Sequence, residues 1–188
     1  MNLKKFIIIS CTIFLYSYVY CQNNTASNKF RAAVIKVDIT PSEPQMLAGY
    51  PERKSTGIHD RIFHRIIALD DGTTQFYLVS TDNCKMSPAL YDKAAEMLKS
   101  RFGIKRENFW WSVTHTHSAP EIGTPGLSII FLPERYKHPL PSDYTTFVEQ
   151  KLAEGIETAR KNLAPARLGV GWGYSKANIN RRAVDIDG

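Results

Sequence analysis

The chain has 188 residues, 43% of them hydrophobic and 22% charged, which suits one globular domain with its own core and argues against a disordered or fibrous protein. The formal net charge is +6, but the basic residues are scattered and form no stripe interleaved with aromatic residues, so nucleic acid is not expected as a partner. We interpret the surplus as solvated surface with a mild attraction to anionic membrane or polysaccharide surfaces.

Residues 1–21 have the pattern of a secretory signal peptide. Lys4 and Lys5 precede an uncharged apolar run that is shorter than the about 20 residues that a membrane span needs. Cleavage directly after Cys21 leaves a small residue at the cut, as signal peptidase requires. Lipid attachment at Cys21 is the alternative, which the bulky Tyr20 disfavours, and a retained membrane anchor ranks third. Both of the first two interpretations export the protein.

Residues 22–29 are rich in Asn, Ser and Thr and predict a disordered linker, so the folded domain is expected to cover 30–188. Cleavage of the signal peptide leaves Cys84 as the sole cysteine, and no intrachain disulfide can then form. We interpret Cys84 as a small buried apolar residue that follows a strand.

Alternating apolar residues predict strands over 31–39, 58–69 and 75–81. The Asp-Gly pair between the second and third of these indicates a hairpin. His64 shares a face of its strand with apolar residues and His59 lies on the other side, so neither is expected to be part of a ligand pair.

Ser87 followed by Pro88 predicts a helix start and Gly103 predicts its end, with an apolar stripe between them. The apolar run 109–113 then predicts a strand, which completes a parallel βαβ unit. A second helix is expected over 144–163 and a strand over 166–174, where glycine alternates with apolar residues. Between the βαβ unit and the second helix, the apolar run 129–132 either binds an apolar tail or lipid surface, or packs onto the domain.

These elements predict an α/β (mixed α+β) fold, a βαβ-containing mixed sheet flanked by helices. Because the sequence stops at Gly188 soon after the last predicted strand, we expect an incomplete domain.

The candidate site is the segment 114–118, Thr-His-Thr-His-Ser, directly after the strand 109–113. In an extended segment His115 and His117 point the same way, because successive side chains alternate in direction. Two imidazoles on one side suit a metal ion, or one metal ligand beside one hydrogen-bond donor. The alternative is that both histidines cap the strand and bond to backbone, since short motifs match often by chance.

Several segments together resemble the N-terminal part of the neutral/alkaline non-lysosomal ceramidase family, in the family's order. They are 37–41 (Val-Asp-Ile-Thr-Pro), 47–50 (Leu-Ala-Gly-Tyr), 57–61 (Gly-Ile-His-Asp-Arg), 80–82 (Ser-Thr-Asp), 114–118 (Thr-His-Thr-His-Ser) and 178–182 (Asn-Ile-Asn-Arg-Arg). Jointly these segments are far more specific than any one of them.

The resemblance implies an exported zinc-dependent amide hydrolase that splits N-acylsphingosine, or a similar ceramide-like lipid, into fatty acid and sphingoid base. It implies that His115 is a zinc ligand and that His117 binds substrate and stabilises its oxyanion. It further implies that Arg181 contacts substrate, that Gly49 lines the pocket, and that Asp82 is a ligand of a second, structural Mg²⁺ or Ca²⁺.

Two departures from the family pattern qualify these expectations. Glu121 stands where the family has glycine, and we expect it to place a charge near the pocket mouth. The remaining zinc ligands implied by the resemblance, a histidine, a glutamate and a tyrosine, lie downstream of Arg181, so this chain alone is expected to be inactive. The alternatives are a secreted, non-catalytic binding module of the same fold, or a related zinc hydrolase acting on another amide or ester.

Overall fold

The computed structural model describes residues 29–48, 53–124, 128–131, 133–135, 137–139 and 141–177. The predicted signal peptide, nearly all of the linker, Gly49 and Arg181 lie outside these residues. The strands are β1 (Arg31–Asp38), β2 (Phe63–Asp70), β3 (Gln75–Thr81), β4 (Phe109–Val113) and β5 (Ala164–Pro165). The helices are α2 (Pro88–Phe102), α3 (Ser128–Phe131) and α4 (Ser142–Lys161), with short 3-10 turns η1 (Arg106–Asn108) and η2 (Pro133–Arg135).

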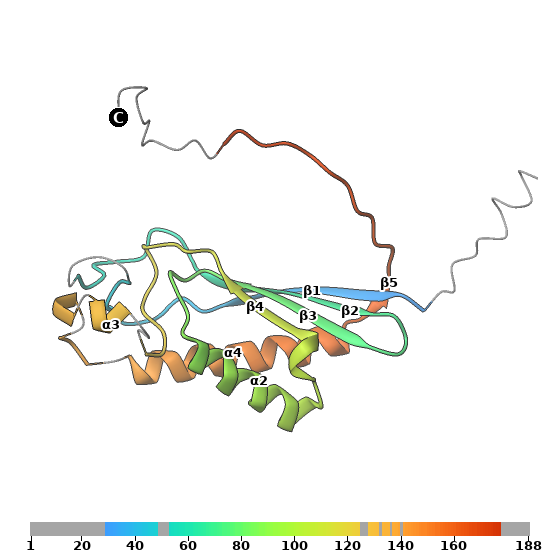
Figure 1. Ribbon diagram of the computed structural model, residues 1–188, viewed down its shortest axis with the longest axis horizontal. Helices are drawn as coiled ribbons and strands as arrows, with labels where there is room; N and C mark the ends of the chain where they lie inside the picture. Colours follow the sequence, from blue (N-terminus) through green and yellow to red (C-terminus); the bar gives the residue numbers. More distant parts are fainter. Residues whose placement is uncertain are drawn as a thin grey trace, which may run out of the picture.

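The described strands form one mixed sheet in the order β4-β3-β2-β1-β5. The strands β1, β2 and β3 pair antiparallel, while β3 and β4 pair parallel across the connecting helix α2. The βαβ unit and the mixed α/β fold are therefore confirmed. Figure 1 shows α2 and α4 together on one side of the sheet, so the helices flank one face.

Helix α2 begins and ends where its sequence predicts. The Ser87 hydroxyl accepts a hydrogen bond from the backbone N–H of Leu90, which satisfies one of the unpaired amides of the first turn. Gly103 ends the helix in the left-handed conformation, with φ of 71°, and its N–H bonds back to the last turn. Both caps fix the length of α2, and therefore the point at which β4 enters the sheet.

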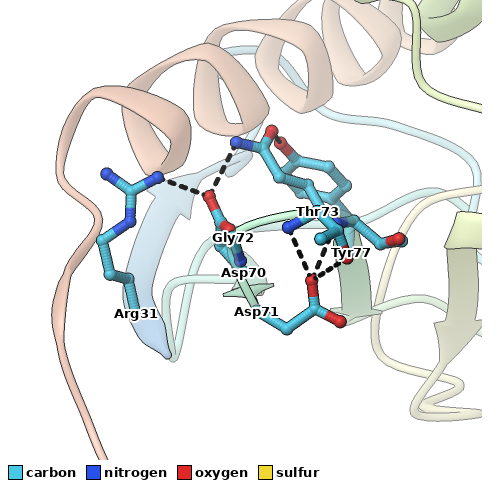
Figure 2. A network of polar contacts seen from close by, with 8 residues as sticks. Arg31, Asp70, Asp71, Gly72, Thr73 and Tyr77 are labelled. Atoms are coloured by element: carbon cyan, nitrogen blue, oxygen red, sulfur yellow. Dashed lines mark hydrogen bonds and ion pairs between the residues drawn. The ribbon is translucent and has the colours of Figure 1, made fainter. Parts of the chain in front are cut away.

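Two aspartates organise the turn of the β2–β3 hairpin (Figure 2). Asp70 accepts hydrogen bonds from the Arg31 guanidinium and from the backbone N–H of Gly72, each at 2.7 Å. Asp71 accepts hydrogen bonds from the hydroxyl of Thr73 and from the backbone N–H groups of Thr74 and Thr73, and these bonds lower the pKa of Asp71 to about 2. Gly72 has φ of 89°, a conformation that favours glycine. The predicted hairpin is thus confirmed.

The core lies between the helices and the inner face of the sheet. Its fully buried side chains come from all layers: Ile39, Ile66, Tyr77, Val79, Leu98, Val148, Leu152 and Ile156. At Gly155, α4 approaches the sheet so closely that an added Cβ would collide with the side chains of Val37 and Ile66. This close approach fixes how α4 sits on β1 and β2.

A buried polar network lies inside this core. His64, which is fully buried, donates from Nε2 to the Val148 carbonyl of α4 at 3.0 Å, and its Nδ1 lies 2.6 Å from the Thr81 hydroxyl. Trp111 donates to the same hydroxyl oxygen at 2.7 Å, which leaves the hydroxyl proton for His64 Nδ1. His64 is therefore neutral, and burial lowers its pKa to about 4. The interpretation of His64 as a structural residue agrees with these contacts.

The outer face of the sheet carries an apolar row that is exposed to solvent. Val34 pairs with Ile67, Ile67 with Leu78, and Leu78 with Trp110, so one exposed apolar side chain from each of four neighbouring strands stands in register. The helices lie on the opposite face (Figure 1).

The strand predicted over 166–174 does not form, and that prediction is wrong. The strand β5 covers two residues, Ala164–Pro165, and 166–177 has no regular secondary structure. Its apolar side chains are exposed, with Trp172 at 99%. Alternation of apolar residues and glycine produces a strand only where a surface buries the apolar side, and the described residues supply none.

Candidate metal centre

The parallel pairing of β3 with β4 brings two chain segments together at one end of the sheet. Beyond the last residues of the two strands, the N–H of Thr114 donates to the carbonyl of Thr81 at 2.9 Å, and the N–H of Thr116 donates to that of Asn83 at 3.2 Å. The segment 82–84 therefore runs beside 114–117, where the candidate histidines lie. Ligand sites commonly form at this carboxyl edge of parallel strands.

The backbone at His115 differs from the extended conformation predicted for it. His115 has φ of 60°, in the left-handed region, which is uncommon for a residue with a side chain, and such outliers cluster at functional sites. The two imidazoles still come together, with ring centroids 5.1 Å apart and planes at 85°. Their proximity therefore comes from a turn in the chain, and the prediction of an extended segment is wrong.

One hydrogen bond fixes the orientation of the His115 ring. Its Nδ1 donates to the backbone carbonyl of Cys84 at 2.7 Å. A carbonyl can only accept, so Nδ1 carries the proton and the lone pair of the neutral ring stands on Nε2. Metal-binding histidines characteristically have this arrangement, in which a backbone carbonyl holds the ring nitrogen that does not bind the metal.

The ligand atoms of Cys84, His115 and His117 all lie within 4.8 Å of one another. The Cys84 sulfur lies 3.7 Å from Nε2 and 3.8 Å from Nδ1 of His117. Nitrogen and sulfur donors in this number suit zinc, which takes imidazole and thiolate ligands in tetrahedral sites. Burial raises the pKa of the Cys84 thiol, so without a cation nearby the sulfur stays protonated.

Asp82 stands at the end of β3 and its carboxylate already has protein partners. Oδ2 accepts the N–H of Phe63 at 3.1 Å, Oδ1 accepts the Arg65 guanidinium at 2.7 Å, and the Thr114 hydroxyl lies 3.4 Å from Oδ1. These contacts tie β2 to the two segments of the site. The role of Asp82 as a ligand of a second cation stays a prediction, and a cation there competes with Arg65.

A groove of about 690 Å³ reaches the segment that follows β4, and its volume is in the range of small-molecule sites, although neither His115 nor His117 lines it. Thr116 and Ser118, the chain neighbours of His117, form part of its wall. The opposite wall comes from the loops 40–47 and 53–60. The groove therefore borders the histidine-bearing segment through the side of the chain that carries Thr116 and Ser118.

Glu121 does not place a free charge at the mouth of this groove, so that expectation is wrong. Its side chain is buried and pairs with the His138 imidazole at 2.7 Å. The backbone N–H of Glu121 donates to the carbonyl of Met46 at 3.0 Å. This contact holds the loop that follows the site against the domain, and the carboxyl group is directed inward.

The short helix α3 carries the apolar run of the long loop. Ile129, Ile130 and Phe131 are exposed, so these residues do not pack onto the domain. Figure 1 places α3 at the end of the sheet where β3 and β4 terminate. The described part of the chain contains no helix that is both long and apolar enough to cross a membrane.

Comparison with known proteins assigns the family. The N-terminal model of the neutral/alkaline non-lysosomal ceramidases matches residues 30–185. The crystal structure of the neutral ceramidase from Pseudomonas aeruginosa is similar with 25% sequence identity and a TM-score of 0.61, over 73% of this chain and 22% of that one. A structure of a ceramidase complexed with C2 gives the same values, so the chain spans 22% of the length of these relatives. The chain belongs to the neutral/alkaline non-lysosomal ceramidase family.

Proposed function

We propose that this chain is the N-terminal portion of an exported zinc-dependent amide hydrolase that cleaves a ceramide-like lipid into fatty acid and sphingoid base. Family membership supports the class of reaction, and the site at the carboxyl edge of β3 and β4 supports its location. The signal-peptide pattern of residues 1–21 supports export.

The observation that carries the proposal is the hydrogen bond from His115 Nδ1 to the Cys84 carbonyl. It directs the lone pair of Nε2 away from that carbonyl and restricts the ring to one orientation. His115 also has a φ of 60°, an uncommon backbone conformation, and such outliers cluster at functional sites. We therefore assign His115 as the zinc ligand of this chain.

A zinc ion at this site supplies a Lewis acid that polarises the amide carbonyl and activates water. His117 lies beside His115 and donates a hydrogen bond to the carbonyl oxygen as negative charge develops there. The groove next to Thr116 and Ser118 admits the substrate. The exposed apolar residues of α3 suit contact with an acyl chain or with a membrane surface that holds the lipid.

Three further roles complete the proposal. Gly49 lines the pocket and Arg181 contacts the polar part of the substrate, and both lie outside the described residues. Asp82, at the end of β3, holds a second, structural Mg²⁺ or Ca²⁺.

The test uses the native protein that carries this sequence and measures fatty-acid release from an N-acylsphingosine. We expect release that stops on zinc chelation, returns with added zinc and is absent from His115→Ala. His117→Ala is expected to retain zinc and lose about 10²- to 10³-fold in kcat, as removal of one oxyanion donor does. Lys99→Ala is the control, since this exposed side chain of α2 lies outside both the groove and the cluster of Cys84, His115 and His117.

Two results would contradict the proposal in different ways. Bound zinc with no hydrolysis of any amide or ester indicates a binding module of the same fold. Hydrolysis confined to other amides or esters leaves the zinc chemistry intact and replaces the lipid substrate.

A further inference from the structure

We propose that Asn83 is a positioning residue for His117, because it holds both ends of the turn 116–120 in which His117 lies. The inference rests on the proposed function, which gives His117 the role of oxyanion donor. Asn83 follows the end of β3 by two residues and is fully buried, so it does not touch a substrate itself. Its effect on the reaction passes through the turn.

The first argument is connectivity. The backbone carbonyl of Asn83 accepts a hydrogen bond from the N–H of Thr116 at 3.2 Å. Its side-chain Nδ2 donates to the carbonyl of Pro120 at 2.6 Å. Only residues 117–119 lie between these two anchor points, so the segment that carries His117 is short and is tied at both ends to one residue.

The second argument is chemistry. Besides the bond to Pro120, the side chain of Asn83 accepts the backbone N–H of Lys85 at Oδ1, at 3.3 Å. A backbone N–H only donates and a carbonyl only accepts, so this place needs one donor and one acceptor on the same side chain. The amide of Asn83 supplies both, whereas a carboxylate supplies acceptors alone. A buried amide is costly unless its polar groups are paired, and here its partners are backbone groups with fixed roles.

The third argument is the place of the turn in the site. Thr116, Ser118 and Pro120 line the groove, so the turn that carries His117 is also part of the groove wall. A hydrogen-bond donor that is displaced by about 1 Å from its productive position can cost about 10²-fold in rate. A residue that holds both ends of this turn therefore sets the position of His117 relative to the groove.

The experiment is a double-mutant cycle in the native protein that carries this sequence, with N-acylsphingosine as substrate. Asn83→Asp keeps the size of the side chain and the acceptor for Lys85 but loses the donor to Pro120, and we expect kcat to fall about 10- to 100-fold with KM and zinc content little changed. In the His117→Ala background the same substitution should cause no further loss, because it acts through His117. Asn162→Asp is the matched control, since it removes a comparable donor to a backbone carbonyl at the exposed end of α4 and should leave kcat unchanged.

Hydrogen exchange, measured by mass spectrometry, provides a readout that needs no hydrolysis. The backbone amides of residues 114–121 should exchange faster in Asn83→Asp than in the unmodified protein or in Asn162→Asp. Faster exchange supports the role of Asn83 even if the unmodified protein hydrolyses no amide or ester, a result that overturns the proposed function alone.

Three results overturn the inference. Unchanged exchange over residues 114–121 shows that Asn83 does not hold the turn. An equal loss of kcat with and without His117 shows that Asn83 acts on the fold in general, and loss of zinc from Asn83→Asp shows that it acts on the metal instead of on His117. If Asn83→Asp does not fold, Asn83→Ala, which buries no charge, replaces it with the same expectations.

Discussion

Acidification is expected to destabilise this domain through His64, which is fully buried in the core. The pKa of His64 falls from 6.5 to about 4 because burial disfavours the charged ring. Between those two values the unfolded chain binds a proton that the folded chain excludes, so stability falls as the pH is lowered through this window. At about 1.4 kcal/mol per pKa unit, the loss between pH 7 and pH 4 is about 3 kcal/mol.

The hydrogen bonds of His64 give the reason that protonation is resisted. The charged ring must donate from Nδ1, so the Thr81 hydroxyl has to turn its own proton away from His64 and accept a second bond beside the one from the indole N–H of Trp111. Protonation therefore requires the network that joins β2, β3, β4 and α4 to rearrange. The larger cost is that the charged ring is removed from water, since His64 is fully buried.

The assay is urea unfolding at a series of pH values, compared with the variant His64→Gln. The variant has the lower free energy of unfolding at pH 7. The difference in this free energy between the two proteins should shrink by about 3 kcal/mol as the pH falls to 4. His59→Gln, at an exposed site, should follow the unmodified chain. The prediction fails if the unmodified chain and His64→Gln differ by the same free energy of unfolding at every pH from 7 to 4. It also fails if the His64 imidazole titrates near pH 6.5 by NMR.

Three further predictions concern packing, capping and exposure. Gly155→Ala should lower the Tm, because collision of the added Cβ with the Ile66 side chain costs about 1–3 kcal/mol. This cost opposes the about 1 kcal/mol by which alanine favours a helix over glycine, and a higher Tm would contradict the prediction. Ser87→Ala should lower the urea midpoint by the equivalent of about 1 kcal/mol, while Ser87→Thr recovers most of it; equal midpoints would show that the cap is unimportant. Acrylamide should quench Trp172 fully and leave Trp111 protected, and protection of Trp172 would show that its segment packs against a surface.

Local sequence patterns predict most of the sheet and helices because each element needs only its own periodicity and caps. Alternating apolar residues and the Asp-Gly pair specify the β2–β3 hairpin, and Ser87 and Gly103 mark the two ends of α2. The apolar run of β4 identifies that strand without reference to a distant partner. The second helix is found over Ser142–Lys161, two residues earlier than the prediction. Here local preference and tertiary packing agree.

The site shows where sequence patterns stop being sufficient. Thr-His-Thr-His identifies His115 and His117, but Cys84 joins them only because β3 and β4 pair in parallel, which places residues 31 apart in sequence side by side. The left-handed backbone at His115 carries no sequence signal, since glycine and asparagine are the residues that usually adopt it. The inward direction of Glu121 depends likewise on its pairing with His138.

The zinc content of the native protein that carries this sequence, purified and brought to equilibrium by dialysis, decides whether the ends of β3 and β4 form part of a metal centre. The account predicts about one zinc per chain, as a single site requires, with none retained by His115→Ala and an unchanged content in His59→Ala. Chains that retain no zinc, or a His115→Ala variant that binds zinc as tightly as the unmodified chain, would contradict the assignment of the metal centre to the ends of β3 and β4.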